Sequence, residues 1–121
     1  MSELKETLAK FLTIPGVRLA ALVGRDGLMI EGVGHDELEK LEALGAMGSS
    51  GLGTAEALGQ ELGRGGVVGT LMEYEGGLVS VDPLGDFAFI VTLSDSPNSL
   101  GHIRYTVKKT RAMLLEALDA S

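Results

Sequence analysis

Few side chains in this sequence could carry out chemistry, and their spacing matches no catalytic or metal-binding motif. The chain has no cysteine, which excludes disulfides, thiolate metal sites and cysteine nucleophiles. Its two histidines, His35 and His102, lie far apart in the sequence, and neither has a partner at H-x-x-x-H spacing. We expect both histidines on the solvated surface, and we predict no metal site and no cofactor.

Serine and glutamate side chains are the other candidates for catalysis. In Gly48-Ser49-Ser50-Gly51, neither serine has glycine on both sides at the G-x-S-x-G spacing of a nucleophile elbow. A Ser-His-Asp site assembled across the fold stays open at this point. Glu73 and Glu75 alternate with apolar residues, which is typical of a solvated strand face and not of an acid–base pair. The sequence therefore predicts no catalytic residue, and we expect a protein that is not an enzyme.

Glycine is abundant, with 18 residues, and several fall in the segment ALGAMGSSGLGTAEALG at residues 43–59. The phosphate-binding pattern G-x-x-x-x-G-K-[ST] is absent, and Gly51-Leu52-Gly53 lacks the third glycine of G-x-G-x-x-G. Each glycine inside a helix costs about 0.5–1 kcal/mol relative to alanine, so small residues here suggest close packing of backbones. A phosphate-binding loop and a helix broken around residues 48–53 remain alternatives.

The hydrophobic pattern predicts the element order α-β-β-α-β-β-β-α. Ser2 is placed to cap a first helix, and Asp36 with Glu39 forms an acidic capping box for the central one. Strong turn signals, Asp26-Gly27 above all, separate the strands. The strands are expected at residues 17–23, 28–33, 67–75, 78–82 and 87–93, the central helix at 37–62, and the last helix from about residue 99. We predict an α+β fold in a single domain, residues 1–121, with an antiparallel sheet covered by helices.

The central helix is apolar or small over more than one face. A helix of this kind is buried on two sides, and in a short chain its own sheet can cover only one. We therefore predict a homodimer in which a second copy covers the other side. The expected interface residues on this helix are Leu41, Leu44, Met47, Gly48, Gly51, Leu52, Ala55 and Leu58.

Charge excludes some partners. The formal net charge of −7 argues against nucleic-acid binding, which depends on neutralising phosphates. No uncharged stretch approaches the roughly 20 residues that span a bilayer, so we expect a soluble, cytoplasmic protein without membrane insertion. Arg104, Lys108 and Arg111 are spaced to share one face of the last helix. That face is either simply solvated, which we prefer, or a docking patch for an acidic partner.

The segment IPGVRLAALVGRDGLMIEGVG, residues 14–34, resembles the opening of roadblock / dynein light chain domains. There a helix ends in a proline–glycine turn, and a hairpin carries a glycine at the place of Gly27. The small-residue central helix, the three later strands and the terminal helix extend the resemblance over nearly the whole chain. It implies a five-stranded antiparallel sheet in a profilin-like sandwich, with the central helix on one face and the terminal helices on the other.

The resemblance also implies a mode of association and a function. In the family, central helices pair and third strands join edge to edge, which adds four residues of the third strand to the interface: Val67, Val68, Thr70 and Leu71. Bacterial relatives act with small Ras-like GTPases, including one that activates the polarity GTPase of gliding motility. The implied function is a homodimeric adaptor that regulates such a GTPase by repositioning the GTPase's own groups.

Other functions stay open beside this one. Eukaryotic relatives are dynein light chains and parts of lysosomal signalling scaffolds, so a structural subunit without effect on nucleotide hydrolysis is the first alternative. A small-molecule sensor is the second. Arg25 and Arg64 lie near predicted turns and could imitate an arginine finger, although we favour solvated turn residues for both.

Overall fold

The computed structural model describes residues 3–120, so the expected cap Ser2 lies outside the described part of the chain. The helices and strands follow one another in the expected order. The helices are α1 (Glu3–Ala9), α2 (Leu41–Glu61) and α3 (Leu100–Ala120), and the strands are β1 (Val17–Gly24), β2 (Met29–Gly34), β3 (Thr70–Tyr74), β4 (Gly77–Leu84) and β5 (Ala88–Ser94).

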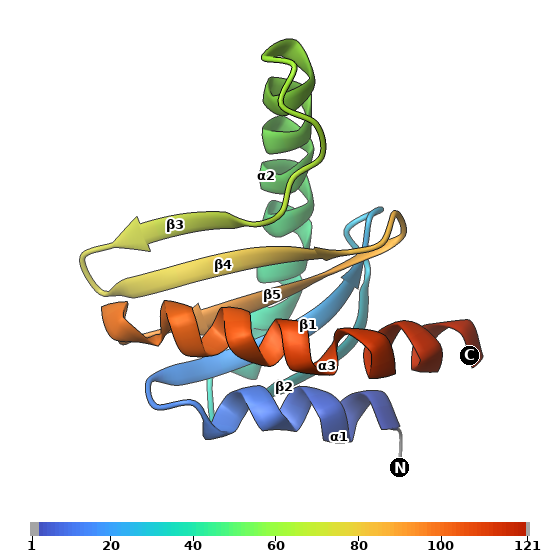
Figure 1. Cartoon of the computed structure of the whole chain (residues 1–121). Helices are drawn as coiled ribbons and strands as arrows, with labels where there is room; N and C mark the ends of the chain where they lie inside the picture. Colours follow the sequence, from blue (N-terminus) through green and yellow to red (C-terminus); the bar gives the residue numbers. More distant parts are fainter. Residues whose placement is uncertain (1–2, 121) are drawn as a thin grey trace.

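The strands form one antiparallel sheet in the order β2-β1-β5-β4-β3. Helix α2 lies on one face of the sheet, and α1 and α3 lie side by side on the other (Figure 1). The predicted α+β fold with helices on both faces is therefore confirmed.

Alternation along the central strand β1 divides the core between the two faces. Leu19, Ala21 and Val23 pack toward α2, whereas Ala20 and Leu22 pack toward α1 and α3. A strand buried on both sides needs a continuous apolar run, and this is the reason that residues 17–23 carry one. The sheet therefore separates two hydrophobic clusters.

The turns that join the strands use glycine where the backbone requires it. Gly27 has a φ of 89°, and its N–H donates to the Gly24 carbonyl over 2.8 Å, which closes the predicted β1–β2 hairpin. Gly77 follows the β3–β4 turn, where an added Cβ would lie 2.1 Å from the Ser94 carbonyl oxygen. Only glycine allows this close approach of two backbones.

The central helix begins later than expected. Residues Leu38–Lys40 form a 3-10 turn, Glu37 takes a left-handed conformation with φ 54°, and α2 starts only at Leu41. The predicted capping box is wrong, since neither turn has a side-chain cap, and the Asp36 carboxylate instead pairs with the guanidinium of Arg18. Asp36 thus forms a charge-assisted bond with an arginine side chain in place of a bond to a backbone N–H of the helix. The alternative of a broken helix is also wrong, because α2 is continuous.

The third strand is shorter than expected. It begins at Thr70 and not at residue 67, and the preceding segment has no ladder partner among the described residues. Two glycines before this segment, Gly63 and Gly65, adopt positive φ where α2 ends, and the chain then returns alongside the helix before β3 begins (Figure 1). Val67 and Val68 therefore lie in a loop.

Candidate functional site

Helix α2 carries two apolar stripes with different surroundings. One stripe faces the sheet of its own chain and is buried: Leu41, Gly45, Gly48 and Leu52. The other recurs at helical spacing through Leu44, Met47, Gly51, Ala55 and Leu58, about a quarter turn to the side. Met47 is 74% exposed and Leu58 58% exposed. The other three residues of this stripe are half-buried, so the second stripe is partly uncovered.

The glycines of α2 serve two different purposes. An added Cβ at Gly48 would lie 3.1 Å from the Phe89 ring, and one at Gly45 would lie 3.3 Å from the Gly27 carbonyl oxygen. These two glycines let the helix approach its own sheet closely. An added Cβ at Gly51 or Gly53 would meet no atom within 4 Å. Because all four lie inside a continuous helix whose N–H groups are already bonded, the segment is not a phosphate-binding loop.

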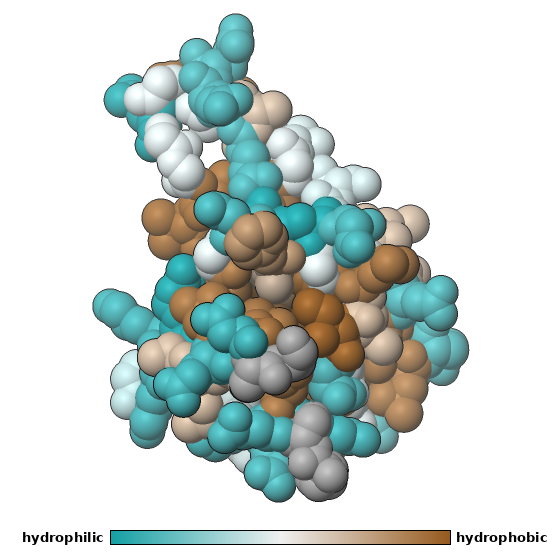
Figure 2. Space-filling view, turned by 90° about the vertical axis from the view of Figure 1, so that its right-hand side faces the viewer, coloured by the Kyte–Doolittle hydropathy of each residue, from teal (hydrophilic) through white to brown (hydrophobic). Residues whose placement is uncertain are grey.

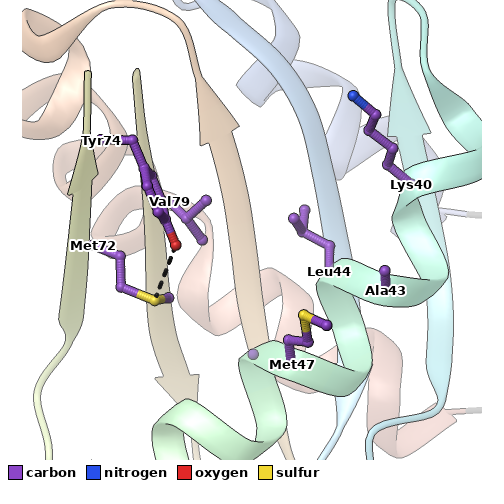
Figure 3. Close-up of a pocket in the computed structure, with 8 residues that line it drawn as sticks. Lys40, Ala43, Leu44, Met47, Met72, Tyr74 and Val79 are labelled. Atoms are coloured by element: carbon purple, nitrogen blue, oxygen red, sulfur yellow. Dashed lines mark hydrogen bonds between the residues drawn. The ribbon is translucent and has the colours of Figure 1, made fainter. Parts of the chain in front are cut away.

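A groove of about 240 Å³ separates the first half of α2 from strands β3 and β4. One wall consists of Ala43, Leu44 and Met47, and the other of Met72 and Tyr74 (Figure 3). The Tyr74 hydroxyl donates to the Met72 sulfur over 3.7 Å, which holds that wall in place. The groove is nearly all apolar, so burying it would be favourable. Sequence reasoning missed Met72 and Tyr74, although their alternation with Glu73 placed them on one strand face.

Strand β3 is the edge of the sheet, with β4 as its neighbour on one side only. An edge strand exposes N–H and C=O groups that can pair with another chain. Thr70 lies on this edge and is half-buried, and the exposed stripe of α2 runs nearby across the groove. The exposed stripe, the groove and the edge of β3 together form what we call the α2–β3 surface.

The structure divides the expected interface residues into three groups. Leu44, Met47, Gly51, Ala55, Leu58 and Thr70 lie on the α2–β3 surface. The side chains of Leu41 and Leu52 and the Cα of Gly48 instead pack into the core of the same chain, and Leu71 packs against the cluster beneath α3. Val67 and Val68 precede the edge strand and line neighbouring hollows.

The basic residues of α3 gather around a separate hollow of about 270 Å³. Arg104, Lys108 and Arg111 line it from the helix, and Arg111 donates to the Pro83 carbonyl over 2.8 Å. The predicted spacing on one helical face therefore places the three cations together. The hollow also reaches Asp82 of β4, an acid within an apolar strand that sequence reasoning did not single out. Burial raises the pKa of the Asp82 carboxyl, and the nearby Arg104 guanidinium opposes this only in part.

The two turn arginines have different environments. Arg25 forms an ion pair of 2.6 Å with Glu56 of α2 and donates a second hydrogen bond to the Gly85 carbonyl. Its guanidinium therefore joins the β1–β2 turn to α2 and is not extended toward a partner. Arg64 is exposed in the loop after α2.

The two histidines and the Ser49 hydroxyl have separate environments. His35 and His102 are both exposed, and the Ser49 hydroxyl donates to the Arg25 carbonyl over 2.7 Å. Between residues 3 and 120, no group of three or more histidine or acidic side chains could hold a metal ion. In the same part of the chain, no helix combines the length and the apolar character that crossing a bilayer would require.

A second apolar area lies where the tips of the β1–β2 and β4–β5 hairpins meet the end of α3. Apolar side chains gather in the middle of this side of the molecule (Figure 2). They surround a hollow of about 260 Å³ lined by Ile30, Leu84, Phe87, Leu115 and Leu118. Phe87 is 85% exposed at its rim. The residues come from three segments that are distant in the sequence, and no local pattern indicates that they meet.

Comparison with known proteins identifies a domain family and similar sequences. The Roadblock/LC7 domain model matches residues 3–94. Uncharacterized protein MJ0714 of Methanocaldococcus jannaschii is 35% identical over 94 residues, which cover 78% of each chain. Uncharacterized protein MJ0310 of the same organism is 34% identical over 94 residues, covering 78% of this chain and 81% of that protein.

Solved structures share the fold at lower sequence identity. Myxococcus xanthus MglB is 16% identical, with a TM-score of 0.87 over 100% of this chain and 98% of that chain. Gliding protein MglB of Thermus thermophilus is 22% identical, with a TM-score of 0.84 over 96% and 88% of the two chains. The Roadblock/LC7 domain from Streptomyces avermitilis is also 22% identical, with a TM-score of 0.81 over 94% and 99%.

Proposed function

This chain belongs to the Roadblock/LC7 domain family, and we propose that it is a cytoplasmic, non-enzymatic homodimeric adaptor that binds and regulates a small Ras-like GTPase. The observation that carries the proposal is the uncovered α2–β3 surface. It combines an exposed apolar stripe, an apolar groove and an unpaired strand edge on one side of a short chain.

A second copy of the chain is the simplest cover for this surface. Helix α2 has 21 residues and is roughly 31 Å long, so two such helices can pair over a distance comparable with a small domain. The open space beside Gly51 allows close approach of a second backbone. In the proposed dimer, Met47 and Leu58 are covered by the partner helix and the edges of β3 meet, which removes both exposed features.

Regulation of a GTPase is the finer part of the proposal. It is supported by membership of the family and by the fold shared with the gliding protein MglB. The proposed adaptor donates no catalytic group. It changes the GTPase by favouring one arrangement of the switch segments, which requires different affinities for the two arrangements.

A structural subunit of a larger assembly is the second candidate. It is favoured by one solved structure of the same fold, described as MglB with tetrameric arrangement, which is 23% identical with a TM-score of 0.84 over 95% of this chain. In this candidate the dimer scaffolds other proteins and leaves the rate of nucleotide hydrolysis unchanged.

One pair of variants tests the dimer. Leu58→Glu introduces a charge on the exposed stripe, whereas Ala57→Glu introduces the same charge at an exposed neighbour outside it. We expect Leu58→Glu to lower the sedimentation mass from two chains to one at micromolar concentration, with Ala57→Glu unchanged. A wild-type mass of one chain at that concentration would contradict the homodimer.

A second experiment separates regulation from scaffolding. The tagged chain is used to isolate partners from its source cells, and any GTPase recovered is assayed for GTP hydrolysis with and without the purified chain. A change in the hydrolysis rate that is lost with Leu58→Glu supports regulation by the dimer. Stable binding with an unchanged rate supports the scaffold, and recovery without any GTPase contradicts the GTPase part of the proposal.

A further inference from the structure

The hollow beside the last helix combines positive charge with an apolar lining. It lies between α3, the end of β4 and the loop that precedes β3, and its volume is about 270 Å³. Three cations and three apolar side chains line it together with one acid: Arg104, Lys108, Arg111, Val68, Val107, Pro83 and Asp82. We call it the α3 pocket. Val68 is 85% exposed at its rim.

Among the described residues, Lys108 and Arg111 of the α3 pocket form no ion pair with their own chain, whereas Arg104 lies beside Asp82. The ion pairs in the described part of the chain involve Arg18, Arg25 and Lys40, and none involves a basic residue of α3. Helix α3 also has no acidic residue from Leu100 to Leu115. Uncompensated positive charge in a chain of net charge −7 attracts a negatively charged group to this one place.

The polar groups at the base of the pocket are held in position, but some of their atoms have no hydrogen-bond partner. The Asp82 side chain is almost fully buried, and neither its Oδ2 nor the buried Nε of Arg104 has a hydrogen-bond partner. Gly69 lies between them, where an added Cβ would be 3.1 Å from Asp82 Oδ1 and 3.2 Å from an Arg104 guanidinium nitrogen. The guanidinium is therefore confined beside Asp82, and buried polar groups of this kind are expected to find partners.

We propose that the α3 pocket binds a short acidic and apolar peptide segment of a partner protein. Carboxylates of the segment pair with Lys108, Arg111 and Arg104, and an apolar side chain of the segment packs against Val68 and Val107. Arginine forks suit carboxylates, and the apolar rim supplies the buried contact that a surface ion pair lacks. A short peptide segment fits a concave pocket, whereas the net negative charge of the chain opposes an anionic membrane surface.

This inference does not depend on the proposed dimer or on a GTPase. The α3 pocket lies on the face of the sheet opposite α2, so both copies in a dimer would present it. A monomeric chain would present it as well. Val68, which the resemblance assigned to the dimer interface, acts here as part of the peptide site.

The test uses random 12-residue peptides displayed on phage and selected against the immobilised full chain. An enriched peptide is then synthesised, and its affinity is measured by fluorescence anisotropy at several salt concentrations. The main variant is Lys108→Glu with Arg111→Glu. Its control is Lys10→Glu with Lys109→Glu, which makes the same change in net charge at exposed residues outside the pocket. Val68→Ser tests the apolar contact at an exposed position that the fold does not need.

We expect enrichment of peptides that contain both acidic and large apolar residues. Affinity should fall by about tenfold or more in the main variant and by several-fold with Val68→Ser, and the control should stay close to wild type. No enrichment, enrichment without acidic residues, or equal losses in the main variant and the control would overturn the proposal. Binding to phosphatidylserine vesicles with the same dependence on Lys108 and Arg111, and without peptide enrichment, would replace the peptide by a membrane surface.

Discussion

The two faces of the sheet differ in how completely the chain covers them. On one face α1 and α3 lie side by side, and Leu8, Phe11, Ile103 and Leu114 are fully buried between them and the strands. On the other face α2 stands alone, and its C-terminal half projects beyond the sheet (Figure 1). Met47, Leu58 and Leu62 are each more than half exposed there.

This difference in coverage indicates which face has apolar area left for association. Two helices cover more of a five-stranded sheet than a single helix does, although hollows beside α3 stay open. A monomer stable on its own normally keeps such apolar area covered. Both faces therefore contribute a buried core, and the α2 face adds an exposed apolar stripe, which is where the proposed self-association belongs.

The largest expected effect on the free energy of unfolding comes from removing a buried side chain of the α1/α3 face. Phe11→Ala removes a fully buried ring and should lower the free energy of unfolding by about 3–5 kcal/mol, measured by urea denaturation. Because dimerisation couples to stability, the measurement is made at several protein concentrations. Phe87→Ala is the matched control, since this ring is exposed and its loss should cost under about 0.5 kcal/mol. Similar losses in both variants would contradict the assignment of Phe11 to the core beneath α1 and α3.

Substitutions at two leucines of α2 compare the buried stripe with the exposed stripe. Leu52 is 1% exposed, so Leu52→Ala should lower the free energy of unfolding by about 2–5 kcal/mol at any protein concentration. Leu58→Ala should cost a dilute chain little and should weaken self-association by roughly tenfold, measured by sedimentation equilibrium. If Leu58→Ala leaves the association constant unchanged, the exposed stripe is not the dimer contact.

Two glycines of the same helix sharpen the comparison further. Alanine is the better helix former by about 1 kcal/mol, and at Gly51 its Cβ meets no atom of its own chain. Gly51→Ala should therefore raise the thermal midpoint of the dilute chain while weakening the dimer. At Gly48 the added Cβ lies 3.1 Å from the buried Phe89 ring, so Gly48→Ala should lower the midpoint at every concentration. Thermal scans over a concentration series distinguish the two, and equal shifts would contradict the separate purposes of these glycines.

The same residues explain how much of the structure was predictable. The fold followed from local patterns, because the apolar run of β1 and the Asp26-Gly27 turn each have one reasonable structure. What each glycine faces was not predictable. Gly48 and Gly51 are only three positions apart on α2, but Gly48 faces the Phe89 ring and Gly51 faces open space. The capping box failed for a similar reason, because Arg18 is distant in sequence and competes for Asp36. Tertiary neighbours decide such positions, and a single sequence does not contain them in readable form.

The smallest expected effect concerns Asp82, the one buried carboxyl of the well-covered face whose pKa is raised. Its pKa is higher in the folded chain than in the unfolded one, so the folded chain binds more protons. Asp82 therefore contributes full stability below the unfolded value of about 3.9, and that contribution is lost as pH rises through the folded pKa.

Asp82→Asn keeps the size of the side chain and removes this titration. We expect the free energy of unfolding of the variant, relative to wild type, to increase as pH rises from about 3.5 to 7, measured by urea denaturation at each pH. Glu73→Gln, an exposed acid on the neighbouring strand, serves as the control and should follow wild type. A difference that decreases with pH would mean that the Arg104 guanidinium outweighs burial at Asp82. Asp82 and Arg104 at the base of the α3 pocket would then form an ordinary ion pair. The difference between the α1/α3 face and the α2 face would hold for their apolar residues only, and not for their charged residues.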